Sequence, residues 1–78
     1  NRDEEVLYQG YKSAFYILQV VYYLRSNTYI DTKRELVYSL DGEDKEILLV
    51  ILNWNSLDVL DNVDFYFEKL INWLKLHI

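Results

Sequence analysis

The chain has 78 residues, of which 51% are hydrophobic and 17% aromatic, and it contains no cysteine, proline or methionine. This length allows one small domain with a single core, and the apolar content excludes a disordered chain. The formal net charge of −5, with no basic stripe, argues against a nucleic-acid partner. Without cysteine the chain can form neither disulfides nor thiolate metal sites.

No segment of the sequence is suited to a membrane. The longest apolar run, residues 47–52, is far shorter than the roughly 20 residues that a spanning helix needs. The chain does not open on a basic stretch followed by an apolar one, so no signal peptide is indicated. We therefore expect a cytoplasmic protein with no membrane partner. The length predicts a single helical domain over residues 1–78. Because the initiator methionine is missing, we expect a piece of a longer protein, either a cloned domain such as a C-terminal fragment or a processed product.

The first predicted element is a long helix over residues 3–25. Acidic residues 3–5 suit its N-terminal end and Arg25 suits its C-terminal end. The alternative is a β-strand over residues 14–24, because β-branched and aromatic residues favour strands. Helical spacing outweighs the strand pattern, because apolar side chains recur at intervals of three and four residues and so form one stripe: Leu7, Tyr11, Ala14, Leu18 and Val21. Tyr8, Phe15 and Tyr22 widen this stripe.

Three shorter helices are predicted after it. Thr32 and Glu35 have the spacing of a capping box, which predicts a short helix from Thr32 to about Leu40. An acidic turn at residues 41–44 begins a third helix that runs to about residue 54. Ser56 is a favourable N-cap for a fourth helix over residues 57–77, whose expected core face is Leu57, Leu60, Val63, Phe67, Leu70 and Leu74. Four helices with short connections predict an all-α fold, an up-and-down four-helix bundle with one short helix.

The residues needed for catalysis are missing, so we expect no catalytic residue and no metal ligand in this chain. The single histidine, His77, lies in the last helical turn, which favours a partner of the helix dipole over a general base. Acidic residues at positions 41–46 suggest a calcium loop, but they lack the alternating ligand pattern and fit a solvated helix start better. A Mg²⁺ site is suggested by Asp58, Asp61 and Asp64, but their spacing fits a polar outer helix face better.

Two groups of residues are candidates for binding. Lys33 falls in the first turn of the second helix, where free N–H groups favour anions, although an ordinary exposed lysine is the alternative. Tyr16, Val20 and Tyr23 recur at i, i+4 and i+7, on the side of the first helix opposite its core face. They predict an interface, because an apolar strip of this kind often marks a binding surface. The alternative is that the third and fourth helices wrap around and bury them.

Residues 16–24 (YILQVVYYL) and 29–35 (YIDTKRE) resemble a known family. They are similar to the C-terminal helical domain of aminoglycoside nucleotidyltransferases of the streptomycin/spectinomycin type, over about residues 12–78. The motif is short. The resemblance implies a substrate-binding helical domain packed against an N-terminal nucleotidyltransferase domain outside this chain. The catalytic residues, the Mg²⁺ and the ATP or other nucleotide would belong to that domain, and this chain would hold no cofactor.

The resemblance also implies site residues. The lysine of the family motif matches Lys33, which would contact the nucleotide or a phosphorylated substrate. The acidic residues that follow this lysine in the resistance enzymes correspond to Arg34 and Tyr38, and Glu35 is the acid that can substitute. We therefore expect substrate or nucleotide binding at Lys33, Glu35 and Tyr38. The changed acidic pattern points to a substrate other than an aminoglycoside.

A stand-alone helical interaction module, such as an antitoxin, immunity or adaptor-like protein, is the alternative function. Its aromatic face would bind a partner protein or a second copy of the chain. The upstream reading frame discriminates between the two functions. A Gly-Ser motif followed by Asp-x-Asp before Asn1 supports the nucleotidyltransferase hypothesis, and a start codon directly before Asn1 supports the interaction module.

Overall fold

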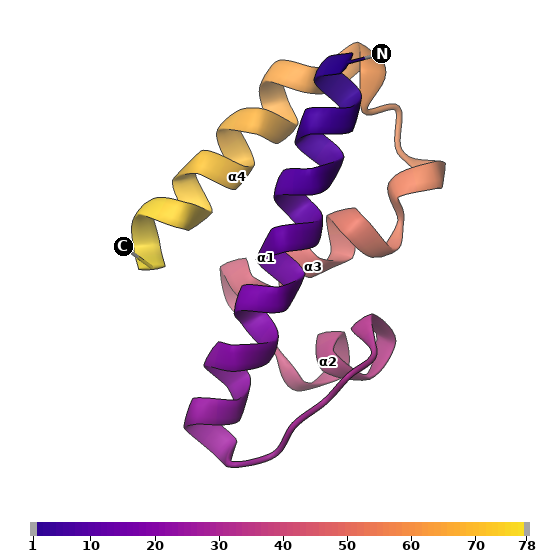
Figure 1. Cartoon of the computed structure of the whole chain (residues 1–78). Helices are drawn as coiled ribbons and strands as arrows, with labels where there is room; N and C mark the ends of the chain where they lie inside the picture. The colour runs from indigo at the N-terminus through magenta and orange to yellow at the C-terminus, as the bar shows by residue number, and fades with distance from the viewer. Residues whose placement is uncertain (1, 78) are drawn as a thin grey trace.

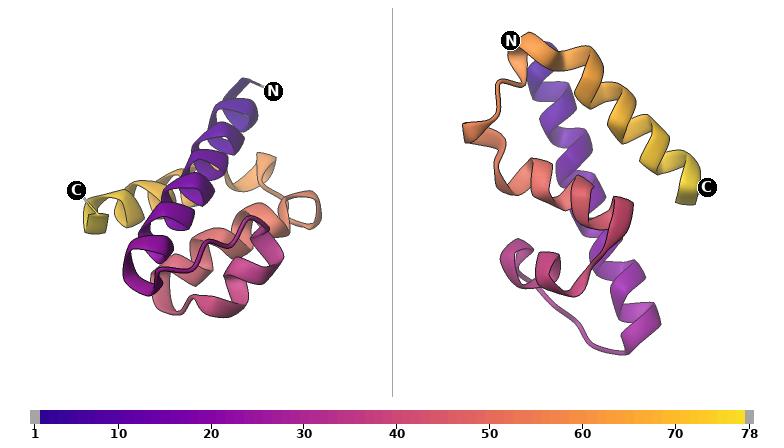
Figure 2. Two further views of the ribbon diagram at one scale, coloured as in Figure 1. Left: turned by 60° about the horizontal axis from the view of Figure 1, so that its bottom comes forward. Right: turned by 180° about the vertical axis from the view of Figure 1, so that it is seen from behind.

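The computed structural model describes residues 2–77, and within this range the regular structure is helical throughout. The chain forms α1 (Arg2–Ser26), α2 (Lys33–Ser39), α3 (Gly42–Leu52), two 3₁₀ turns, η1 (Trp54–Ser56) and η2 (Leu60–Asn62), and α4 (Val63–His77). The predicted all-α fold of four helices, one of them short, is confirmed. α1 and α4 begin at the same end of the molecule, α3 packs on α1 and α4, and α2 packs on α3 (Figures 1 and 2).

α1 agrees closely with its prediction and supplies a large share of the core. Its buried face is Leu7, Tyr11, Ala14, Phe15 and Leu18. The helix ends at Asn27, which has a φ of 58° and whose backbone N–H donates to the Tyr23 carbonyl at 2.7 Å. Asparagine tolerates this left-handed conformation better than most residues, so the end of the helix is encoded locally.

α2 begins at the predicted cap. The Oγ1 of Thr32 accepts a hydrogen bond from the backbone N–H of Glu35 at 3.3 Å, and Thr32 itself has extended backbone angles. The return bond of a full capping box, from the Glu35 carboxylate to the Thr32 N–H, is not formed within residues 2–77. Leu36 and Val37 are the side chains that α2 buries.

Thr32→Ala is expected to lower the free energy of unfolding by about 1 kcal/mol, because the N–H of Glu35 loses its acceptor. Urea denaturation of the variant and the wild type measures the difference. Thr28→Ala, which makes the same chemical change outside the helix, serves as the control. If Thr32→Ala leaves both the midpoint and the slope of the urea transition unchanged, the Thr32 cap does not contribute to stability.

The predicted start of the fourth helix at Ser56 is wrong. α3 ends at Leu52, two 3₁₀ turns follow, and α4 begins only at Val63. Polar side chains bond to nearby backbone here: the Asn53 side-chain amide donates to the Leu49 carbonyl at 2.9 Å and that of Asn62 to the Asp58 carbonyl at 2.8 Å. Such local bonds compete with a continuous helix and divide this segment into short turns.

The later start of α4 also changes its core face. Leu70 and Trp73 are its buried residues, whereas the expected core residues Leu60 and Phe67 are about half exposed. The prediction assumed an uninterrupted helix from residue 57, and the break before Val63 changes which side chains point inward.

α1 and α4 approach each other closely at Gly10. A methyl group built on this glycine would come within 2.7 Å of Cδ2 of Leu70, so the absence of a side chain admits the neighbouring helix. Nearby, the buried Tyr11 hydroxyl donates to the Tyr66 carbonyl at 2.6 Å. These contacts fix the position of α4 along the first half of α1.

None of the helices within residues 2–77 combines the length and the apolar content required to span a bilayer.

Candidate functional site

An apolar strip lies on the outer face of α1, in its second half. The predicted interface residues Tyr16, Val20 and Tyr23 are 54%, 58% and 44% exposed, and Ile17 and Leu24 extend the exposed surface on the same half of the helix. We call these five residues the α1 strip. α3 and α4 therefore do not wrap around and bury it, so the alternative in which the strip is core is excluded.

The α1 strip ends abruptly toward the N-terminus. One, two and three turns before Tyr16, the same outer face carries Ser13, Gln9 and Glu5, which are polar and exposed. Exposed polar residues are the ordinary outer surface of a helix, so the first half of α1 needs no further cover. Its second half is apolar on both faces, a pattern usual for helices that pack on two sides.

The predicted substrate-binding residues do not come together. The Lys33 Nζ sits 4.9 Å from the centroid of the Phe15 ring, a cation–π contact that ties α2 to α1. Glu35 is exposed near the cap of α2. Tyr38, at 79% the most exposed aromatic residue described, lines a separate groove between α2 and α3 to which neither Lys33 nor Glu35 contributes.

This groove has a volume of about 250 Å³ and carries positive charge. Arg34 from α2 and Lys45 from α3 supply the cations, and no acidic residue lines it. Tyr38 provides an aromatic ring, and Asn53 provides an amide. The groove therefore has the chemistry to hold an anion, through Arg34 and Lys45 instead of the predicted Lys33.

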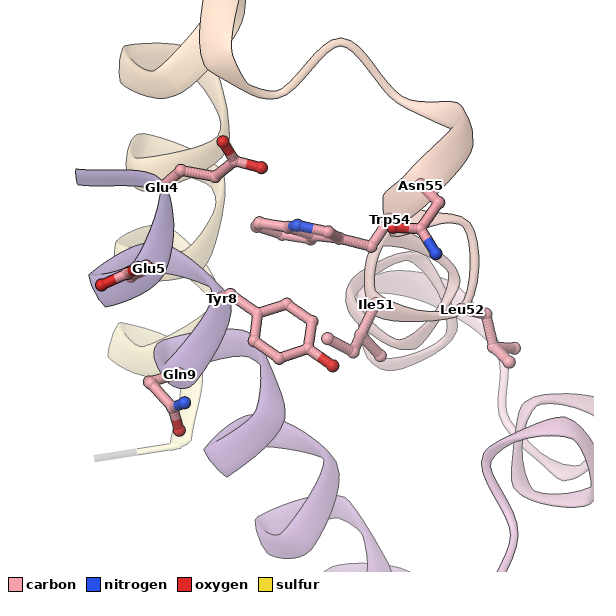
Figure 3. A pocket seen from close by; sticks show the side chains of 8 residues that line it. All are labelled: Glu4, Glu5, Tyr8, Gln9, Ile51, Leu52, Trp54 and Asn55. Atoms are coloured by element: carbon pink, nitrogen blue, oxygen red, sulfur yellow. The ribbon is translucent and has the colours of Figure 1, made fainter. Parts of the chain in front are cut away.

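A second cavity, of about 490 Å³, lies between the first turns of α1 and the chain that leaves α3 (Figure 3). Its walls carry two carboxylates and two aromatic rings, from Glu4, Glu5, Tyr8 and Trp54. The sequence pattern does not indicate this cavity, because it places Tyr8 on the core face of the first helix and Trp54 at the end of the third. The available signal was a tryptophan between two asparagines, in a segment too polar to be core.

His77 and Asp44 form a structural pair. One Asp44 oxygen accepts a hydrogen bond from the Trp73 indole N–H at 2.8 Å and lies 2.9 Å from the His77 Nε2. Its second oxygen faces the Arg25 guanidinium at 3.7 Å. The carboxylate thus connects the first turn of α3 with the last turns of α4 and α1. His77, expected to act on the helix dipole, instead bonds to a side chain of another helix.

The two acidic groups that suggest metal sites, at residues 41–46 and 58–64, do not bring their carboxylates together around one point. Within residues 2–77, no three potential ligands are grouped so that they could hold a metal ion. Asp58 and Asp61 are close enough to share a hydrogen bond, which together with their mutual repulsion raises the pKa of the Asp58 carboxyl. The pair is a feature of the exposed η2 region.

Comparison of the chain with protein-family models, with curated proteins and with solved structures found no match.

Proposed function

We propose that this chain is a non-catalytic helical domain that works by pairing the α1 strip with a helix of a partner protein. One observation carries the proposal: five apolar side chains stay exposed on the second half of α1 although the domain has a complete core elsewhere. Strips of this kind are unusual on a surface that faces only water.

The spacing within the strip indicates the kind of partner. The spacing from Tyr16 to Val20 is four residues and from Val20 to Tyr23 three. The spacing from Ile17 to Val20 is three residues and from Val20 to Leu24 four. Alternation of three and four is the seam along which two helices pack. Tyrosine suits such a seam because the ring becomes buried while the hydroxyl remains hydrated or bonded.

In a purified sample of the protein, the available partner is a second copy of the same chain. Two strips crossing near Val20 would form an isologous contact, in which each copy uses the same residues. Each strip offers on the order of 400 Å², judged from the area that aromatic residues bury. The total stays below the roughly 1,200 Å² at which stable interfaces begin, so we expect a weak dimer.

Replacing both Tyr16 and Tyr23 with serine is expected to abolish self-association and to change the stability of the monomer by less than about 0.5 kcal/mol. Sedimentation equilibrium up to millimolar concentration measures the first effect, and urea denaturation measures the second. The matched control replaces Tyr29 and Tyr38, which are 62% and 79% exposed and lie outside the strip. A wild-type chain that stays monomeric at millimolar concentration contradicts self-pairing through the strip.

A second candidate function is the substrate-binding role beside an N-terminal nucleotidyltransferase domain, which the sequence resemblance implies. The cationic groove of Arg34, Tyr38 and Lys45 favours it, since a nucleotide or phosphorylated substrate carries the complementary charge. In this case the α1 strip would pack on that domain, which would also bind the Mg²⁺ and the nucleotide. The upstream reading frame tests it, because the Gly-Ser and Asp-x-Asp motifs must precede Asn1.

A further inference from the structure

We propose that the cavity at the start of α1 binds a single organic cation, an alkylammonium or guanidinium group, between the Glu4 carboxylate and the Trp54 indole. This site lies at the opposite end of α1 from the strip and does not depend on it. Its volume of about 490 Å³ falls within the range of about 300–1,000 Å³ that is usual for small-molecule sites.

The indole of Trp54 is held in a fixed orientation. The Tyr8 ring meets it edge-to-face, with the ring centroids 5.2 Å apart and an angle of 68° between the planes. Tyr11 supports it from the core at 5.8 Å and 56°. A ring that is already in place loses little freedom when a ligand binds, which favours binding.

Figure 3 shows the two sides of the indole. Tyr8 lies on one side of its plane, and the Glu4 carboxylate reaches over the other, while the Glu5 side chain points away. A ligand entering between Glu4 and Trp54 therefore meets a carboxylate on one side and an aromatic face on the other. Tryptophan is the best of the aromatic rings for contact with a cation, and a carboxylate supplies the opposite charge.

The charges at the cavity select the ligand. Two glutamates line it and no basic residue does, so an anion is disfavoured. No lysine, arginine or histidine side chain that the structure describes pairs with the Glu4 carboxylate. A metal ion is disfavoured too, because the site offers no third ligand within residues 2–77 and aromatic faces suit organic cations better.

Titration of the ¹⁵N-labelled chain with choline at constant ionic strength tests the proposal. The two tryptophans give two indole N–H signals, and we expect the Trp54 signal to shift saturably while that of Trp73 stays in place. The neutral isostere 3,3-dimethylbutan-1-ol is expected to leave both unchanged. An equal response to the isostere would show that the cavity recognises shape and not charge, and the proposal would fail.

The variant Glu4→Gln is expected to raise the dissociation constant for choline at least about fivefold. Glu68→Gln, which removes the same charge from the exposed side of α4, is the matched control and is expected to leave it unchanged. An unchanged affinity in Glu4→Gln overturns the site. A parallel titration with blocked lysine and arginine amides identifies the source of the cation: tighter binding than choline indicates a basic side chain of a protein, and weaker binding indicates a free small molecule. If neither class binds, the proposal is wrong.

Discussion

Trp73→Ala is expected to lower the free energy of unfolding by about 3–5 kcal/mol, close to the whole stability of the domain. Trp73 is 0% exposed and is the largest of the fully buried side chains. Its loss leaves a cavity between the helices and removes the indole donor from Asp44. Chains of this length have about 4–12 kcal/mol of stability, so the variant should be on the edge of unfolding at room temperature.

Circular dichroism during urea denaturation measures this effect. Leu76→Ala, on the same helix but 66% exposed, is the control and should change the stability by less than about 0.5 kcal/mol. Trp73→Phe keeps most of the volume and separates the packing contribution from the hydrogen bond to Asp44. If Trp73→Ala shifts the midpoint no more than Leu76→Ala does, the placement of α4 in this fold is wrong.

The wild-type domain is expected to lose stability steeply above pH 10, and Tyr11→Phe is expected to lose less. Burial, and to a smaller extent the charge of Tyr66, raise the pKa of Tyr11 well above its ordinary value of 10.0. Above that pH the unfolded chain releases this proton and the folded chain retains it. Because the folded state then binds more protons, stability is fully present below pH 10 and falls by about 1.4 kcal/mol per pH unit above it.

Denaturation at pH 7 and at a series of values above 10 measures the difference. At pH 7 Tyr11→Phe should be less stable by about 1 kcal/mol, because the hydrogen bond to the Tyr66 carbonyl is lost. The gap should close as the pH rises. Tyr16→Phe, which changes an exposed tyrosine, should follow the wild type at every pH. A constant gap between Tyr11→Phe and the wild type would show that Tyr11 is not the group responsible.

Features encoded within a few turns of helix were predictable from the sequence. The core face of α1 follows from the spacing of Leu7, Tyr11 and Leu18, and all three are buried. The cap of α2 follows from Thr32 and Glu35, and the helix begins where they place it. The exposure of Tyr16 and Tyr23 follows from the same periodicity, since residues opposite a core face point outward unless another element covers them.

Features that join distant segments were not predictable in this way. Ser56 has the right chemistry for an N-cap, yet the local bonds of Asn53 and Asn62 divide the segment into turns. The cavity combines residues of the first turns of α1 with Trp54, which lies after α3, and no local pattern indicates that they meet. The same applies to Asp44, whose partners Trp73 and His77 belong to another helix.

The position of α4 in the chain has a consequence for biosynthesis. Leu70 and Trp73 of α4 fill the part of the core beside α1 that α2 and α3 do not cover. During translation α1 emerges first, and until both α3 and α4 have followed, part of its core face is uncovered together with the α1 strip. Nascent chains with such surfaces are prone to aggregate and are the usual clients of chaperones. The domain is thus most vulnerable to wrong association on the ribosome, before α4 has docked on α1.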